Sequence, residues 1–163
     1  MKRNKCPQCG RLLVESAGNP DSEILLIGEY PGWEELRDGV PFTGRTGQVL
    51  RDVLAREGID IHRCRLTNLW LHEHPTKDRP CDINYHVKCL TRELKGRKYA
   101  LAMGSDVCRL ITGVGAMSKS GLRVANPLSA AITYIAPNPA TVFHGTVGEL
   151  YLAVHEFAKE INK

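Results

Sequence analysis

The sequence lacks any apolar run that approaches the roughly 20 residues needed to cross a lipid bilayer, and its start, MKRNKCPQCG, lacks the apolar core of a secretory signal peptide. We therefore expect a cytoplasmic protein without membrane association. The sequence also lacks internal repeats, low-complexity tracts and linker-like segments, so we expect one domain, residues 1–163. The net charge of +4 permits contact with a polyanion without requiring it.

Four short apolar runs predict buried parallel strands, because they are almost continuously hydrophobic rather than alternating. These runs span residues 23–27, 63–69, 98–103 and 131–136. Helical spacing of apolar residues occurs over residues 47–57, 84–95, 105–112 and 146–161, and the last of these opens with the capping-box spacing of Thr146 and Glu149. We expect a three-layer α/β/α domain with a central four-stranded parallel sheet. Ligands of such sheets bind beyond the carboxyl ends of the strands.

Two motifs follow the first predicted strand. The turn GEYPG, residues 28–32, has two glycines and a proline, so its backbone can approach a ligand closely, although a plain strand-to-helix turn has the same composition. In the segment GVPFTGRTG, residues 39–47, Phe42 stands between glycines, and a ring on a rigid loop can stack on a nucleobase. Arg45, just before a predicted helix, suits a phosphate or a structural carboxylate.

The stretch GEYPGWEELRDGVPFTGRTG closely resembles the first motif region of the family 4, iron–sulfur uracil-DNA glycosylases, with the pattern GE-x-PG and then PF-x-GR-x-G. The resemblance covers nearly the whole chain: Cys6 and Cys9 stand in the family's N-terminal position, Asn68 ends the second predicted strand, and residues 138–140 stand at the second motif. It implies a uracil-DNA glycosylase-like fold. It also implies hydrolysis of the N-glycosidic bond of uracil, or of a related modified pyrimidine, flipped out of DNA.

The resemblance also implies the residues of the site. Phe42 would stack on the flipped base, and Asn68 would read its edge, because an amide offers one acceptor and two donors. A cap after the strand is the structural alternative for Asn68. Glu29 would position the attacking water or stabilise positive charge on the sugar, unless it only holds the turn through backbone amides. The predicted base-binding residues are Gly28, Tyr30, Gly32, Phe42 and Asn68, and the predicted catalytic residues are Glu29 and Asn138.

Two positions depart from the family pattern. Asn138 stands where the family has a histidine that donates to the pyrimidine O2, and an amide can donate there but carries no charge. Tyr30 stands where the family has a small residue, so its ring would narrow the pocket. Gly32 leaves space at C5 of the base, as in family 4. The alternative function is therefore a protein on the same fold that binds or modifies a DNA base, with a hypermodified pyrimidine as substrate and little or no uracil excision.

The cysteines predict a metal site, because Cys6 and Cys9 have the two-residue gap that lets both sulfurs face one metal. By resemblance, two later ligands complete a [4Fe–4S] cluster: Cys89 matches one position, and His72 stands at the other, where Cys81 could replace it. The predicted metal ligands are therefore Cys6, Cys9, Cys81, Cys89 and His72. The first two belong to a predicted N-terminal metal-binding segment, residues 1–20. Zinc is the alternative metal, since three cysteines and a histidine, or four cysteines, form a normal structural zinc site.

Basic side chains predict contact with DNA, which is the expected partner of a monomeric chain. The predicted DNA-binding residues are Arg45, Lys77, Arg79 and His144. In the segment of residues 137–144, Val142 or Phe143 could wedge into the gap left by a flipped base, or both could simply anchor the last helix.

The other cysteines and histidines are expected to play structural parts. We expect Cys64 and Cys108 to be buried thiols, and His74 and His86 to lie at the surface. The sequence CPQC alone would also fit a metal-binding interaction module without a base pocket.

Overall fold

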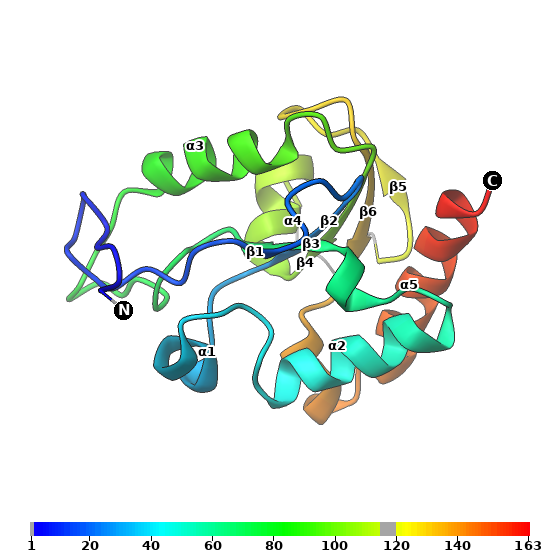
Figure 1. Ribbon diagram of the computed structural model, residues 1–163, viewed down its shortest axis with the longest axis horizontal. Coiled ribbons are helices and arrows are strands. Elements are labelled where there is room, and N and C mark those ends of the chain that lie inside the picture. The colour runs from blue at the N-terminus through cyan, green and yellow to red at the C-terminus, as the bar shows by residue number, and fades with distance from the viewer. Residues whose placement is uncertain (1, 115–119) are drawn as a thin grey trace.

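The computed structural model describes residues 2–114 and 120–163 and is built around one sheet (Figure 1). The six strands follow the order β1-β3-β2-β4-β6-β5. The four central strands are parallel: β3 (Arg65–Asn68), β2 (Ile24–Gly28), β4 (Tyr99–Met103) and β6 (Ile132–Ala136). They confirm the predicted parallel sheet. The edges add two antiparallel strands of two residues each, β1 (Ala17–Gly18) and β5 (Arg123–Val124), which are too short for the apolar pattern to indicate.

Helices cover both faces of this sheet (Figure 1). They are α1 (Trp33–Asp38), α2 (Arg45–Arg56), α3 (Ile83–Leu94), α4 (Ser105–Thr112) and α5 (Val147–Ile161), with the short 3-10 helices η1 (Ile61–Arg63) and η3 (Pro139–His144). α2 and α5 pack on the face that includes Leu26, and α3 and α4 pack on the face that includes Leu25 and Ile27. Successive side chains of β2 thus enter two different cores, which explains why the strand is apolar without alternation.

The helix ends show where local sequence signals hold and where they fail. Gly58 follows the end of α2 with a φ of +77°, as its position predicts. The predicted capping box of α5 is wrong, because Thr146 makes no side-chain capping bond and its Oγ1 lies 2.6 Å from Thr141 Oγ1 instead. In residues 2–114 and 120–163, no helix combines the length and the apolar composition needed to span a bilayer.

Phe157 tests the packing of α5 on the sheet, since it is fully buried and its ring meets Tyr134 edge-on at 6.0 Å. Phe157→Ala should lower the free energy of unfolding by about 3–5 kcal/mol, because it removes the ring and leaves a cavity. Leu152→Ala, on the exposed side of the same helix, is the control and should change this free energy by less than about 0.5 kcal/mol. Urea denaturation measures both, and equal effects would contradict the packing described.

Candidate active site and metal centre

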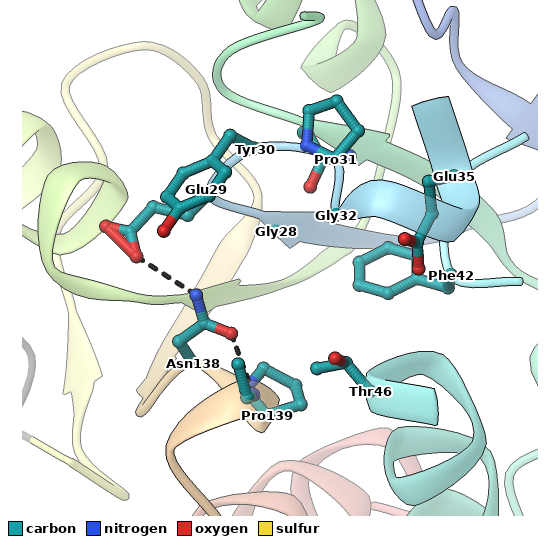
Figure 2. Close-up of a pocket in the computed structure, with 12 residues that line it drawn as sticks. Gly28, Glu29, Tyr30, Pro31, Gly32, Glu35, Phe42, Thr46, Asn138 and Pro139 are labelled. Carbon is teal, nitrogen blue, oxygen red and sulfur yellow. Dashed lines mark hydrogen bonds between the residues drawn. The ribbon is translucent and has the colours of Figure 1, made fainter. Parts of the chain in front are cut away.

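A pocket of about 80 Å³ opens beyond the carboxyl ends of β2 and β3, where sheets of this kind bind ligands (Figure 2). All seven residues predicted for base binding and catalysis line it: Gly28, Glu29, Tyr30, Gly32, Phe42, Asn68 and Asn138. Five residues that the sequence analysis does not identify complete the lining: Pro31, Glu35, Thr46, Pro139 and Ala140. The volume suits one planar ring better than a drug-sized ligand, whose pockets span roughly 300–1,000 Å³.

Gly28 allows the ring of Phe42 and the amide of Asn68 to meet. In the parallel ladder, Gly28 of β2 stands directly beside Asn68 of β3. A Cβ at position 28 would lie 2.3 Å from Asn68 Oδ1 and 2.9 Å from Phe42 Cζ, so a larger residue would displace both groups. Phe42 has a φ of +60°, and within residues 2–114 and 120–163 no other non-glycine residue has a positive φ. Backbone strain of this kind costs on the order of 1–3 kcal/mol and gathers at functional sites.

The amide of Asn68 is available to a ligand. The residue is 5% exposed, and its backbone carbonyl accepts a hydrogen bond from the Thr67 hydroxyl at 3.4 Å. Among residues 2–114 and 120–163, no group hydrogen-bonds the side-chain amide itself, and the cap that was the structural alternative is absent. Because Asn68 lines the pocket, its amide can exchange hydrogen bonds with a bound molecule.

The carboxylate of Glu29 is held from two sides, of which Figure 2 shows the bond from Asn138. Its Oε2 accepts a hydrogen bond from the backbone N–H of Asp106, in the first turn of α4, at 2.9 Å. Its Oε1 accepts a hydrogen bond from Asn138 Nδ2 at 3.1 Å. The carboxylate thus lies at the start of α4, and a helix start interacts favourably with negative charge. Asn138 Oδ1 in turn accepts from the backbone N–H of Ala140 at 2.9 Å, which leaves one hydrogen on Nδ2 for a ligand.

Glu35 is a buried carboxylate in the pocket wall that the sequence analysis misses. It is 5% exposed, and its Oε1 accepts a hydrogen bond from the backbone N–H of Gly44 at 3.0 Å. This carboxylate and the ring of Phe42 both line the pocket (Figure 2). A Cβ at position 32 would lie 2.8 Å from Glu35 Oε2, so the space that Gly32 leaves borders a carboxylate. The available signal was the acidic start of α1 directly after the Pro-Gly turn.

Tyr30 forms the exposed rim of the pocket beside Glu29 (Figure 2). Its ring meets the ring of His74 at 5.0 Å, and His74 Nε2 lies 2.8 Å from Asp106 Oδ2. The same carboxylate oxygen accepts a hydrogen bond from Trp70 Nε1 at 3.2 Å. Asp106 therefore contacts the rim through its side chain and holds Glu29 through its backbone N–H. The exposed position expected for His74 is confirmed.

Comparison with known families adds to this geometry. The sequence profile of the Uracil DNA glycosylase superfamily matches residues 15–156, a range that contains every residue of the pocket lining. The chain belongs to this superfamily. The match confirms both the resemblance and the α/β fold expected from it.

Two relatives of this superfamily member are named Type-4 uracil-DNA glycosylase. The relative from Thermotoga maritima is 39% identical over 70 residues, which cover 38% of this chain and 36% of the relative. The relative from Archaeoglobus fulgidus is 34% identical over 85 residues, which cover 50% of this chain and 42% of the relative. The chain thus spans about two fifths of the length of these curated relatives.

Potential metal ligands of this uracil DNA glycosylase superfamily member converge where the N-terminal segment meets the loop before α3 (Figure 1). Cys6, His72, Cys81 and His86 bring their ligand atoms within 4.8 Å of one another. The surface position expected for His86 is wrong: the residue is fully buried, because α3 turns it toward Trp70, 5.0 Å away between ring centroids. Burial and the neighbouring His72 lower the pKa of His86 to about 4, so the ring is neutral at physiological pH.

Two other predicted ligands flank this group, and the remaining cysteines lie apart from it. Cys9 Sγ lies 3.3 Å from His72 Nε2. Cys89 lies outside the group of four, and its Sγ accepts a hydrogen bond at 3.2 Å from an arginine of the same helix. Cys64 and Cys108 are buried, as expected, and burial raises the pKa of each thiol to about 12. These two thiols therefore stay protonated at neutral pH.

The residues predicted to contact DNA are exposed at two places on the surface. Arg45, at the start of α2, stacks over the ring of Phe143 in η3 at 5.5 Å. His144 lines a second cavity that shares part of its lining with the pocket. Lys77 and Arg79 lie on the loop between β3 and α3. Arg45 and His144 thus border the pocket region, whereas Lys77 and Arg79 share a loop with potential metal ligands.

Gly47 tests how α2 supports the strained position of Phe42. A Cβ at position 47 would lie 1.9 Å from the backbone oxygen of Phe42, whereas a Cβ at Gly148 in α5 would meet nothing within 4 Å. Gly47→Ala should therefore destabilise the protein by about 1–3 kcal/mol, and the control Gly148→Ala should stabilise it by about 0.5–1 kcal/mol through helix propensity. Chemical denaturation of the pair measures this difference. A Gly47→Ala protein as stable as the Gly148→Ala protein would rule out the close contact.

Proposed function

We propose that this member of the uracil DNA glycosylase superfamily hydrolyses the N-glycosidic bond of a uracil, or of a related modified pyrimidine, that is flipped out of DNA. The observation that carries the proposal is the unpaired amide of Asn68, which lines the same small pocket as the ring of Phe42. The two Type-4 uracil-DNA glycosylase relatives support uracil as the base. One chain supplies the whole lining, so a monomer suffices.

The pocket must recover the energy that base flipping costs. Extrusion of a base costs a few kcal/mol, and a stack between a base and an aromatic ring contributes roughly 1–3 kcal/mol. Phe42 offers a ring that its strained backbone holds in one position. The amide of Asn68 offers an acceptor for N3–H and a donor for O4 of uracil. Stacking and edge recognition together therefore offset the cost of flipping.

In bond cleavage, Glu29 and Asn138 would each have a separate role. The C1′–N1 bond breaks and its electron pair leaves with the base, while a water molecule adds its oxygen to C1′ and releases a proton. The fixed carboxylate of Glu29 is suited to orient this water and to stabilise positive charge on the sugar. The second N–H of Asn138 can donate to the pyrimidine O2, where negative charge develops. An amide supplies this donor without the positive charge of a histidine.

A pyrimidine with a hydroxylated substituent at C5 is the second candidate substrate, and Glu35 is the observation that favours it. The residue nearest to the side-chain position of Gly32 is Glu35, a carboxylate rather than an apolar wall. A carboxylate accepts a hydrogen bond from a hydroxyl group, whereas the methyl group of thymine offers it none. 5-hydroxymethyluracil combines such a hydroxyl with the same N3–H and O4 edge that Asn68 can read.

Contact with the DNA backbone completes the proposed function. Arg45, beside the pocket, and His144, in the adjoining cavity, can meet phosphates close to the flipped nucleotide. Lys77 and Arg79 can meet phosphates farther along the strand. Every phosphate that such a residue neutralises should make binding more sensitive to salt.

We further propose that the metal centre serves structure and takes no part in bond cleavage, because none of its donors lines the pocket. The resemblance to family 4 implies a [4Fe–4S] cluster held by Cys6, Cys9, Cys81 and Cys89, and zinc is the alternative. In either case, the metal would fix the N-terminal segment to the loop that follows Asn68.

Asn68 is the residue whose replacement tests the proposed function most directly. Asn68→Ala should reduce uracil excision by roughly 10²-fold or more, because it removes a positioned hydrogen-bonding group from the base. It should change the free energy of unfolding little, because the amide has no partner within the described residues. The assay incubates a uracil-containing oligonucleotide with protein and cuts abasic sites with alkali. Full activity of Asn68→Ala, or no excision of any pyrimidine lesion by the unmodified protein, would contradict the proposal.

Glu35 gives a separate test of the second candidate. The unmodified protein should excise 5-hydroxymethyluracil faster than uracil, and Glu35→Gln should reduce this preference by about tenfold, because a hydrogen bond to a neutral group is weaker than one to a charged group. Excision of uracil by Glu35→Gln is the control and should stay close to that of the unmodified protein. If the preference is the same in both proteins, the carboxylate does not read the C5 substituent.

A further inference from the structure

The two metals expected from the sequence require different donors. A [4Fe–4S] cluster is held almost always by four thiolates, which stand well apart because four irons and their sulfides lie between them. A single zinc ion takes four cysteine or histidine donors at the corners of a small tetrahedron. In this chain the group of closely spaced donors contains two imidazoles and only two of the six cysteines. The donor set therefore fits one ion and does not fit the four-thiolate cluster.

The distances between donors agree with a single tetrahedral ion. Zinc lies about 2.3 Å from sulfur and about 2.0–2.1 Å from nitrogen, so neighbouring ligands lie about 3.8 Å apart for two sulfurs and about 3.5 Å apart for sulfur and nitrogen. Cys6 Sγ lies 3.7 Å from Cys81 Sγ. His72 Nε2 lies 3.4 Å from Cys81 Sγ and 3.3 Å from Cys9 Sγ. Each of these distances is close to an edge of the zinc tetrahedron.

The hydrogen bonds of the two histidines give them different roles. His72 Nδ1 lies 2.6 Å from the backbone oxygen of Glu73, so Nδ1 carries the hydrogen and Nε2 keeps a lone pair for a metal. His86 Nδ1 accepts a hydrogen bond from the backbone N–H of Leu71 at 3.2 Å, so in the neutral ring the hydrogen is on Nε2. This Nε2 lies 3.1 Å from His72 Nε2, 3.7 Å from Cys81 Sγ and 3.8 Å from Cys6 Sγ, so it stands among the donor atoms. Because this nitrogen carries the hydrogen of the neutral ring, His86 fits a hydrogen-bond donor to the centre rather than a ligand.

We propose that three thiolates and one imidazole of this chain bind a single zinc ion. The ligands are Cys6, His72 and Cys81 of the group of four, together with Cys9, which lies outside this group beside His72 and takes the place of His86. His86 supports the centre from outside by donating a hydrogen bond, and Cys89 takes no part, because its sulfur accepts a hydrogen bond from Arg92 Nη2. This assignment rests on donor geometry and is independent of the proposed glycosylase activity.

Arg11 balances the charge of such a centre. Three thiolates and one zinc ion carry a net charge of −1, which is costly to bury without a partner. Arg11 is 8% exposed, and its Nη2 donates a hydrogen bond to the backbone oxygen of Arg79, on the loop that carries Cys81. Its Nε is buried without a hydrogen-bond partner among the described residues. A cationic side chain at this position fits an anionic zinc–thiolate centre.

The metal content of the full chain, purified without oxygen or chelators, tests the proposal. We expect one zinc ion per chain, no iron, no acid-labile sulfide and no visible absorption. X-ray absorption at the zinc edge should show three sulfur ligands and one nitrogen ligand, at about 2.3 Å and about 2.0 Å. Brown protein that contains iron and sulfide would overturn the assignment, and so would two sulfur and two nitrogen ligands.

Matched variants identify the ligands by their zinc content and zinc affinity, measured by competition with a chromogenic chelator. Cys89→Ser should retain zinc with unchanged affinity, although the four-cysteine cluster requires this residue. His86→Gln should retain zinc with roughly 10- to 100-fold lower affinity, as expected for a group that supports a ligand. Cys9→Ser and His72→Ala should lose far more. Because loss of a ligand can unfold the chain, Cys89→Ser and His86→Gln decide the question: loss of zinc from either one contradicts the proposal.

Discussion

The parallel pairing of Gly28 with Asn68 is the contact on which the candidate site depends. It continues past the ends of both strands, because the backbone N–H of Leu69 donates to the oxygen of Gly28 and that of Trp70 donates to the oxygen of Glu29. The pairing therefore fixes the recognition amide and the candidate catalytic carboxylate in one step. The missing side chain of Gly28 then admits the ring of Phe42 to the same space. Position 28 requires a glycine, because its backbone, the amide of Asn68 and the ring of Phe42 approach one another closely.

The link between Glu29 and Asn138 shows how the site accommodates the exchange of histidine for asparagine. The amide oxygen of Asn138 caps η3 within the second motif, and one amide hydrogen holds the carboxylate of Glu29 in the first motif. One side chain therefore joins the two motifs. A neutral donor makes a weaker partner for a developing anion than a charged one. Under the proposed function, Asn138 would therefore contribute less to stabilising the departing base than a histidine would, and more to positioning the carboxylate of Glu29.

The sequence predicted the four parallel strands because apolar runs are local signals, and the resemblance to family 4 implied the seven residues that line the pocket. It missed what depends on distant contacts. From the sequence, Glu35 looks like an exposed acid of a short helix. In the structure, the backbone N–H of Gly44 donates to its carboxylate, and the absence of a side chain at Gly32 leaves room for it. His86 looks like a surface residue of α3, but its burial is decided by Trp70 and by the loop after β3. Neither neighbour is visible in the local pattern.

The loop between β3 and α3 gives the proposed metal centre a structural role. It runs from residue 69 to residue 82, so 14 residues without a helix or strand follow directly after Asn68. Loops of this length are uncommon in small domains, and their ends are held only by what they contact. A backbone hydrogen bond from Val14 N–H to the oxygen of Leu71 holds the start of this loop against the N-terminal segment. A metal that joins His72 and Cys81 to the N-terminal segment closes the loop at both ends. The centre would therefore act on base recognition from a distance, by holding the strand end that presents Asn68.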